Sequence, residues 1–339
     1  MASIPAARKI GDAPMNPIGF GAMGMAHGFP SYGAPPSDEE RFKLLDAVYD
    51  SGCRHWDTAD AYGDSEEFIG RWFARTGKRD EIFIATKCAV NAAGPPRGDA
   101  AYVKQQCNAS LKRLGVQRID LFYLHRIDTR TPIELTIRAM VDLINEGKIT
   151  YIGLSECGVS DLRRAHAVHP INALQMDYSP LWLNIERSGI LAATKELGIT
   201  LVAYSPLGKG LITGQYKSPD DFEPGDYRLG IPRFSKDNFP RILAAVDKIR
   251  DVAKAHNATP GQVALAWILS QSDNIVVIPG TKKVKYLKEN MGALDVKLTV
   301  EEIQAVREIC EESDRVLDGD RMPAHTRPFV LVESPPLVE

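Results

Sequence analysis

The chain has 339 residues, which is enough to bury one large core or two ordinary ones. Its 41 basic and 44 acidic residues give a net charge of −3 at pH 7. This argues against a general nucleic-acid or anionic-membrane binder, because such proteins are usually visibly basic. The five cysteines form no C-x-x-C pair, so we expect buried thiols. The N-terminus lacks an apolar signal core, and no apolar run is long enough to span a membrane. We therefore expect a cytoplasmic protein.

Short apolar runs alternate with helical patterns along most of the chain. Strands are predicted near residues 18–21, 54–57, 82–87, 121–125, 151–155, 173–176, 201–204 and 275–278. Helices are predicted near 38–51, 65–75, 101–114, 132–146, 160–166, 190–197, 241–256, 260–269 and 284–291. About eight strand–helix cycles without a linker predict a single α/β domain over residues 1–313, built as a (β/α)₈ TIM barrel, with a doubly wound open sheet as the alternative.

Three segments lie outside the regular cycles. Residues 208–238 form a Gly/Pro-rich insertion, and a further helix is predicted near 299–311. The tail from 314 to 339 has no periodicity, so two interpretations are open: it caps the mouth of the barrel, or it is disordered.

A glycine-rich segment imitates a dinucleotide-binding motif. Gly19 to Gly24 fits G-x-G-x-x-G, whose glycines should open a helix that holds a pyrophosphate. The segment that follows, residues 25–36, contains three further glycines and three prolines and cannot form that helix. We therefore expect the glycines to serve a tight strand-to-loop exit near a ligand.

Polar side chains end three successive predicted strands. These are Asp57, Lys87 and His125, and Tyr62 follows in the loop after the first of them. Each has an ordinary structural explanation when taken singly. Because the carboxyl ends of parallel strands meet at one face of a barrel, their joint placement instead predicts a proton-transfer site.

The four residues suit the reduction of a carbonyl group. A phenol has an unperturbed pKa of about 10, and a neighbouring ammonium lowers that value by stabilising the phenolate. Lys87 supplies this charge and Asp57 holds Lys87 in place, while His125 orients the carbonyl oxygen or relays the proton. Tyr62 is then the proton donor. The set contains neither a strong nucleophile nor metal-ligand spacing, so we expect no metal.

Several segments, in order, resemble the aldo-keto reductase family. Asp57 to Gly63 is similar to its D-T-A-x-x-Y-G segment, and Ala85 to Lys87 and Tyr123 to His125 are similar to its lysine and histidine strands. The likeness continues through residues 153–155, 203–208, 278–282 and 289–290. The fungal and plant auxin-induced or pyridoxal-reductase-like branch is the most similar.

The resemblance implies a (β/α)₈ barrel, NADPH/NADP+ as cofactor and a small-molecule carbonyl substrate. It also implies the residues that contact the cofactor, with Tyr204 stacking on the nicotinamide, Ser155 and Gln175 at its carboxamide, and residues 205–207 and a lysine pair at phosphates. The cofactor set is Ala22, Met23, Asp57, Ser155, Glu156, Gln175, Tyr204, Ser205, Pro206, Leu207, Lys209, Gly210, Gly280, Lys282, Glu289 and Asn290.

The chain departs from the family pattern at two positions that bear on cofactor choice. Tyr286 and Lys209 stand where many members have arginine, and Lys is a weaker bidentate phosphate ligand. Trp56 and Trp182, together with Phe29, Tyr32 and the tail, are candidates for the substrate pocket. A monomer and a homo-oligomer are both open.

The sequence leaves two other functions open. One is a redox-sensing regulatory subunit that binds NADP(H) with little turnover. The other is a tailoring reductase of natural-product biosynthesis. The sequence predicts no nucleic-acid or membrane partner.

Overall fold

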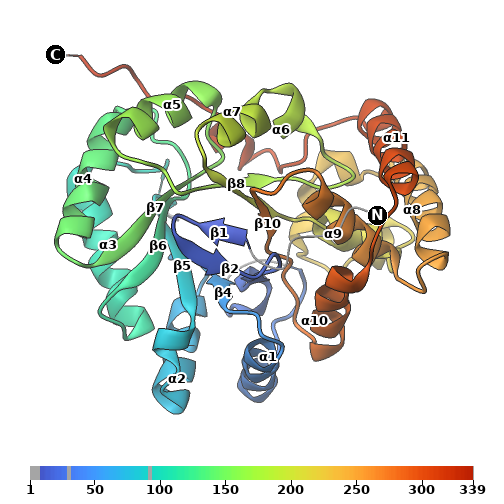
Figure 1. Ribbon diagram of the computed structural model, residues 1–339, viewed down its shortest axis with the longest axis horizontal. Helices are drawn as coiled ribbons and strands as arrows, with labels where there is room; N and C mark the ends of the chain where they lie inside the picture. The colour runs from blue at the N-terminus through green and yellow to red at the C-terminus, as the bar shows by residue number, and fades with distance from the viewer. Residues whose placement is uncertain (1–7, 29–31, 91–93, 339) are drawn as a thin grey trace.

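Eight parallel strands form the centre of the molecule. The computed structural model describes residues 8–28, 32–90 and 94–338, and within them the strands are hydrogen-bonded in the order β10-β9-β8-β7-β6-β5-β4-β3. Parallel bridges from Ile18 to Val277 and from Gly21 to Gly280 join the first strand to the last. The sheet therefore closes into a barrel (Figure 1), which confirms the (β/α)₈ prediction over the open sheet. The strands are β3 (Phe20–Gly21), β4 (His55–Asp57), β5 (Phe83–Cys88), β6 (Ile119–Leu124), β7 (Ile149–Ser155), β8 (Ala173–Asp177), β9 (Thr200–Tyr204) and β10 (Ile275–Val277).

Helices surround this barrel (Figure 1). They are α1 (Asp38–Asp50), α2 (Ser65–Thr76), α3 (Ala100–Leu114), α4 (Ile133–Asn145), α5 (Val159–Val168), α6 (Asn184–Arg187), α7 (Ile190–Glu196), α8 (Phe239–Lys254), α9 (Pro260–Ser270), α10 (Val284–Met291) and α11 (Val300–Val316). The expected helix bounds hold within a few residues, and α10 matches them at both ends. The last helix continues to Val316, three residues past the predicted domain boundary. Ser37 and Glu40 form the predicted capping box at the start of α1.

An N-terminal hairpin that the sequence pattern did not predict closes one end of the barrel. It consists of β1 (Arg8–Ile10) and β2 (Ala13–Met15), and it lies over the middle of the barrel in Figure 1. Ile10 and Met15 pack with the apolar residues that line the barrel interior, including Leu121 and Val276. Because the catalytic residues of such barrels lie at the opposite, carboxyl-terminal face, the hairpin serves packing.

Glycines allow the first and last strands to approach each other. A Cβ on Gly21 would lie 2.8 Å from the carbonyl oxygen of Ile278, and a Cβ on Gly280 would lie 2.9 Å from that of Gly21. The G-x-G-x-x-G segment leads into a single 3-10 turn, η1 (Met23–Met25), rather than a long helix. The motif therefore opens no dinucleotide-binding helix, and its Gly21 instead lets the first and last strands approach.

Two irregular segments cover the carboxyl-terminal face of the barrel. The insertion contains four 3-10 helices, η3 (Gly208–Thr213), η4 (Pro219–Asp221), η5 (Tyr227–Gly230) and η6 (Pro232–Phe234). The segment after α11 places Arg321 against the ends of β7 and β8, and a short 3-10 turn, η8 (Arg327–Phe329), follows. Ser334 then bonds to Asp161 of α5, where the chain ends near α5 in Figure 1.

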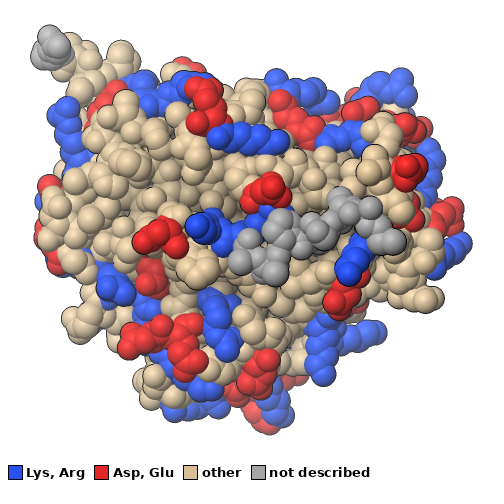
Figure 2. Space-filling view, in the orientation of Figure 1, with Lys and Arg blue, Asp and Glu red and all other residues tan. Residues whose placement is uncertain are grey.

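The remaining features are ordinary for a mixed-charge protein. Basic and acidic side chains are interspersed over the face shown in Figure 2, in line with the small net charge. All five cysteines are buried and free. Among the described residues, no helix has the length and apolar character needed to cross a membrane, and no group of three or more His, Cys, Asp and Glu is arranged to hold a metal ion.

Candidate active site

Strand alternation directs the predicted catalytic side chains into the mouth of the barrel. Ala85, Leu121 and Tyr123 belong to the apolar cluster inside the barrel. Because side chains alternate along a strand, Lys87 lies on the same inward side as Ala85. His125 is two residues after the inward Tyr123 and directly follows the end of β6, so it continues the same side. Asp57 ends β4 beside Ala85 of β5. Three successive strands thus bring these side chains to the carboxyl-terminal mouth of the barrel.

Asp57, Tyr62, Lys87 and His125, which we call the tetrad, meet there. The Lys87 ammonium donates to Asp57 Oδ1 at 2.5 Å and to the Thr58 carbonyl oxygen at 2.6 Å, and it lies 5.0 Å from the centroid of the Tyr62 ring. The rings of Tyr62 and His125 are 5.7 Å apart and nearly perpendicular. Lys87 has no exposed surface, and Asp57 is 2 % exposed. A buried ion pair therefore holds the ammonium beside the phenol.

Burial and charge act on these groups in opposite directions. Burial raises the pKa of Tyr62, and the positive charge of Lys87 lowers it, as predicted. The lowering by Lys87 is smaller than the rise caused by burial. Burial, with the charges of Arg126 and Lys87, holds the pKa of His125 well below its usual range. His125 is therefore a neutral imidazole at neutral pH, suited to hydrogen bonding with a carbonyl oxygen.

An ionic anchor holds the loop that carries Tyr62. Arg41, fully buried on α1, bonds to both carboxylate oxygens of Asp64 at 2.8 and 2.7 Å. Asp64 Oδ1 also accepts from the His27 backbone N–H at 2.7 Å, and the Asp64 N–H donates to the His27 carbonyl at 3.1 Å. Segments 22–28 and 57–64 are thereby fixed to each other, with Tyr62 between Asp57 and Asp64 in the chain.

Gly63 is required for this close approach, and its replacement is expected to be costly. Its φ is +48°, and an added Cβ would lie 1.9 Å from the His27 carbonyl oxygen. Gly63→Ala is expected to lower the free energy of unfolding by about 3 kcal/mol or more, since overpacking adds to the left-handed backbone cost. Gly77→Ala is the control, because Gly77 has a φ of +69° with nothing within 4 Å of the added Cβ. Denaturant unfolding measures both variants, and equal losses would contradict the role of the His27 contact.

Asp60, behind the site, is a buried carboxyl with an altered pKa. Burial and, to a smaller extent, the carboxylate of Glu66 raise its pKa to about 7, although the charge of Arg113 opposes the shift. Its Oδ1 atom has no hydrogen-bond partner among the described residues, and its backbone N–H donates to the Lys87 carbonyl at 3.1 Å. The folded state therefore favours the protonated form.

This shift predicts a pH dependence of stability. Because the pKa is raised in the folded state, the stabilisation is complete at low pH, is lost as pH rises from about 4 through about 7, and is absent above. Asp60→Asn is expected to exceed the wild type in stability at pH 8 by on the order of 2 kcal/mol, and to lose that advantage near pH 4. Thermal melts of both proteins from pH 4 to 9 check this. A difference that does not vary with pH would show that Asp60 is ionised throughout.

The expected carboxamide residues are paired on neighbouring strands, Ser155 at the end of β7 and Gln175 in the middle of β8. Gln175 donates to Asp57 Oδ2 at 2.8 Å, so it touches the tetrad directly. Ser155 ends β7 and is buried. The residues that directly follow β5, β7 and β9 all have positive φ, namely Ala89 (99°), Glu156 (53°) and Ser205 (51°). Such strain in non-glycine residues is concentrated at functional sites, and here it marks the ends of three alternate strands of the barrel.

The expected phosphate residues divide between two places. Pro206, Leu207 and Gly210 lie at η3 after β9, with Lys209 and Gly210 both at positive φ. Gly280 and Lys282 lie between β10 and α10, where Lys282 donates to the carbonyls of Gly33 and Ala34 at 3.2 and 2.9 Å. Ala22 follows β3 and donates to the Asp57 carbonyl at 2.8 Å, and Met23 starts η1. Glu289 and Asn290 lie late in α10, beside α9 rather than with the tetrad.

A residue of the tail joins the site, which the sequence did not predict. Arg321 is 4 % exposed and donates to Glu156 Oε2 at 2.5 Å, to Asp177 Oδ2 at 3.2 Å and to the Tyr204 hydroxyl at 3.0 Å. The Tyr204 hydroxyl donates to Glu156 Oε1 at 2.7 Å, and Lys209 pairs with Asp177 at 2.8 Å. The residue expected to face the nicotinamide is therefore bonded to the tail. Arg321 lies in a segment without periodicity, so no local signal identifies it.

The residues predicted to line the substrate pocket lie in different places. Trp56 is fully buried between β4 and α2, with its ring 4.7 Å from Trp72 and 6.1 Å from Phe73. It points outward because it alternates with the inward Asp57, so the prediction that it lines the pocket is wrong. Trp182 is half-buried, with the guanidinium of Arg321 5.1 Å from its ring centroid. Tyr32 lies 5.0 Å from the guanidinium of Arg228, and Phe29 is outside the described residues.

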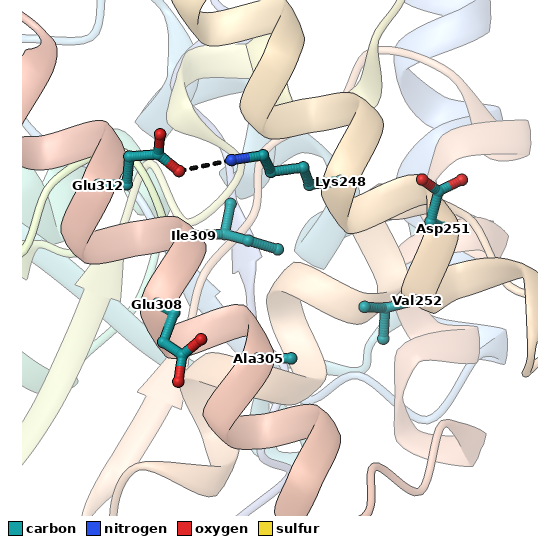
Figure 3. A pocket seen from close by; sticks show the side chains of 7 residues that line it. All are labelled: Lys248, Asp251, Val252, Ala305, Glu308, Ile309 and Glu312. Atoms are coloured by element: carbon teal, nitrogen blue, oxygen red, sulfur yellow. Dashed lines mark hydrogen bonds and ion pairs between the residues drawn. The ribbon is translucent and has the colours of Figure 1, made fainter.

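A surface pocket elsewhere is unrelated to this chemistry. It lies between α8 and α11 on the outside of the barrel, where Lys248 and Glu312 form an ion pair (Figure 3). Its lining contains no member of the tetrad and consists of Lys248, Asp251, Val252, Ala305, Glu308, Ile309 and Glu312. It carries no catalytic arrangement of side chains.

Known proteins similar to this chain share both the sequence pattern and the fold. The sequence profile of the Aldo/keto reductase family matches residues 17–311. The chain is 59 % identical to aldo-keto reductase str7 of Strobilurus tenacellus, over 93 % of this chain and 94 % of that protein. It is 46 % identical to aldo-keto reductase yakc of Schizosaccharomyces pombe, whose name specifies NADP(+), over 99 % of each.

Among solved structures, a glycerol dehydrogenase from Gluconobacter oxydans is similar, with a TM-score of 0.82 at 27 % identity, covering 94 % of this chain and 98 % of that one. The family profile spans all four residues of the tetrad, and the two sequence relatives cover nearly the whole chain. On this evidence the chain belongs to the aldo-keto reductase family and is an NADP-dependent oxidoreductase.

Proposed function

We propose that the protein reduces an aldehyde or ketone to the alcohol with NADPH, and that Tyr62 donates the proton. The observation that carries this proposal is the buried Lys87–Asp57 ion pair directly beside the Tyr62 ring, with the His125 ring on another side of the phenol. No nucleophile is needed for such a reaction. A phenol, an ammonium and a neutral imidazole around one point supply what the carbonyl oxygen needs.

The donor set around the site fits NADP(H). Lys282 has no carboxylate within salt-bridge distance among the described residues, and it lies just before α10, whose first turn has no side-chain cap. A cation beside an uncapped helix N-terminus favours a phosphate group. Tyr204, Ser155 and Gln175 would meet the nicotinamide end, next to Asp57. When bound, the cofactor supplies the hydride that the carbonyl carbon receives.

The protein's own residues then act on the carbonyl oxygen. His125 is neutral and positions that oxygen by a hydrogen bond, and Tyr62 transfers its hydroxyl proton to it. The Lys87 ammonium stabilises the phenolate that remains, and Asp57 keeps Lys87 charged in a buried place. In alcohol oxidation the same phenolate accepts the proton, because each step is reversible.

We also propose that residues 314–339 cap the site. Arg321 bonds to the ends of β7, β8 and β9, the Leu331 N–H donates to the Glu156 carbonyl at 3.2 Å, and Ser334 bonds to α5. The segment thus runs from α11 across the strand ends to the other side of the barrel. A closed mouth excludes water and strengthens the electrostatic interactions inside it.

A cofactor-oxidation screen tests the proposed function. The purified protein is given NADPH with aromatic aldehydes, 1,2-dicarbonyls, pyridoxal and sugars, and NADH serves as the cofactor control. Turnover of at least one aldehyde or ketone with NADPH is expected. Tight retention of NADP(H) without turnover of any member would overturn the proposal in favour of a binding subunit.

A further inference from the structure

We propose that Arg126 forms an anion subsite that selects carbonyl substrates carrying a carboxylate. This inference rests on the proposed function and names the substrate class of the same site. It concerns the residue that directly follows His125 at the end of β6. No motif in the sequence pointed to it.

Hydrogen bonds place the Arg126 guanidinium between the ends of β6 and β7. Its Nη1 atom donates to the His125 carbonyl oxygen at 2.8 Å and to Ser155 Oγ at 3.4 Å. The side chain is half-buried. The Arg126 charge is also one of the causes that hold the pKa of His125 low and oppose the rise in that of Tyr62. The cation is therefore close enough for its charge to act on both reacting groups.

Arg126 differs from Lys87, Lys209 and Arg321 in having no carboxylate within ion-pair distance among the described residues. Lys87 pairs with Asp57 at 2.5 Å, and Lys209 pairs with Asp177 at 2.8 Å. Arg321 pairs with Asp177 at 3.2 Å as well as with a glutamate. For Arg126, no described carboxylate lies within the 4.0 Å limit of an ion pair.

The mouth therefore has an unbalanced positive charge. Among the described residues, Glu156 and Asp177 form ion pairs with Arg321 and Lys209, and Asp57 forms one with Lys87. The charge of Arg126 acts on Glu156 from beyond ion-pair distance. A partly buried cation without a carboxylate in direct contact costs free energy, because part of its hydration is lost. An anionic ligand group offsets that cost.

The chemistry of guanidinium favours a carboxylate. To the described residues, Arg126 donates through Nη1, to a carbonyl and a hydroxyl oxygen. The remaining N–H groups of the planar fork can meet the two oxygens of a carboxylate. Because Arg126 and His125 are adjacent in the chain, the carboxylate and the reacting carbonyl belong to one small molecule. The inferred substrates are carboxylate-bearing aldehydes or ketones.

The test compares matched substrates that differ only in charge. 4-Carboxybenzaldehyde is compared with methyl 4-formylbenzoate, and 4-oxobutanoate with its methyl ester, each with NADPH. The measured quantity is the ratio of kcat/KM for the acid to that for the ester. Arg126→Gln is expected to lower this ratio about 10-fold or more, mainly through KM of the acids, and Arg126→Lys is expected to lower it less.

Arg138→Gln is the matched control, since Arg138 is an exposed arginine on α4 and its loss changes the net charge equally. It is expected to leave the ratio unchanged. Calorimetric binding of the product 4-(hydroxymethyl)benzoate and of its methyl ester gives an independent readout of the same preference. Unfolding curves verify that each variant is folded.

The outcomes separate the two proposals. If Arg126→Gln lowers both members of each pair by the same factor, or neither, and the binding preference does not change, the anion subsite is wrong. If the wild type turns over no aldehyde of either charge, the proposed function fails. A loss of acid preference that Arg138→Gln reproduces would assign the effect to net charge and overturn the subsite.

Discussion

Tyr62→Phe is expected to lower kcat for aldehyde reduction by about 100-fold or more, because it removes the only proton that the proposed mechanism donates. The aromatic ring and its contacts with Lys87 and His125 remain in the variant, so stability should change little. Steady-state NADPH oxidation measures the effect. NADPH binding followed by fluorescence is expected to persist, since the hydroxyl acts on the substrate.

Tyr49→Phe is the matched control for this result. Tyr49 is also a tyrosine whose hydroxyl bonds to a charged side chain, that of Glu81, but it lies on α1 outside the barrel. It should retain full turnover. If Tyr62→Phe keeps wild-type kcat for every aldehyde that the wild type reduces, another group donates the proton and the assignment of Tyr62 is wrong.

Arg321→Met is expected to lower the free energy of unfolding by about 3 kcal/mol, because it leaves the buried carboxylate of Glu156 without its cation. Asp177 keeps Lys209 as a partner, so the loss is concentrated at Glu156. The charge of Arg321 holds the pKa of Glu156 below its usual range although burial raises it. This stabilisation is therefore present at neutral pH and is lost as pH falls through the folded-state pKa.

Two further variants make the Arg321 result specific. Arg327→Met removes an arginine from the same segment whose side chain is 72 % exposed, and it should cost less than about 1 kcal/mol. Adding Glu156→Gln to Arg321→Met should recover part of the loss, because no buried charge is then unpaired. Denaturant unfolding measures the stability of each variant, and limited proteolysis measures access to residues 314–339. Equal losses for Arg321→Met and Arg327→Met would show that the buried contacts do not hold the tail.

Much of the site follows from local sequence. Asp57, Lys87 and His125 end apolar runs of four to six residues, and a parallel arrangement alone is enough to bring such ends together. Helix α10 has the bounds predicted from its sequence pattern. The roles of the cofactor residues rest on the family resemblance, and their bonds in the structure support them as proposals.

Other features depend on contacts that are distant in sequence. Trp56 and Asp57 are neighbours in the chain, yet one packs against α2 and the other enters the mouth. The sequence of a strand shows that successive side chains point to opposite faces. It does not show which face lines the barrel interior, because both faces of a barrel strand are buried. Only the position of the helices decides this.

By itself, the sequence determined the order of strands and helices, the four polar strand-end residues and the family pattern, because these depend on periodicity and on residues close in the chain. Only the tertiary structure decided that Gly21 and Gly280 close the barrel, that Arg321 reaches Glu156 across 165 positions, and that Arg126 lacks a carboxylate partner among the described residues. These features are pairings of distant groups. Their free energy comes from burial and charge complementarity, which no local pattern encodes.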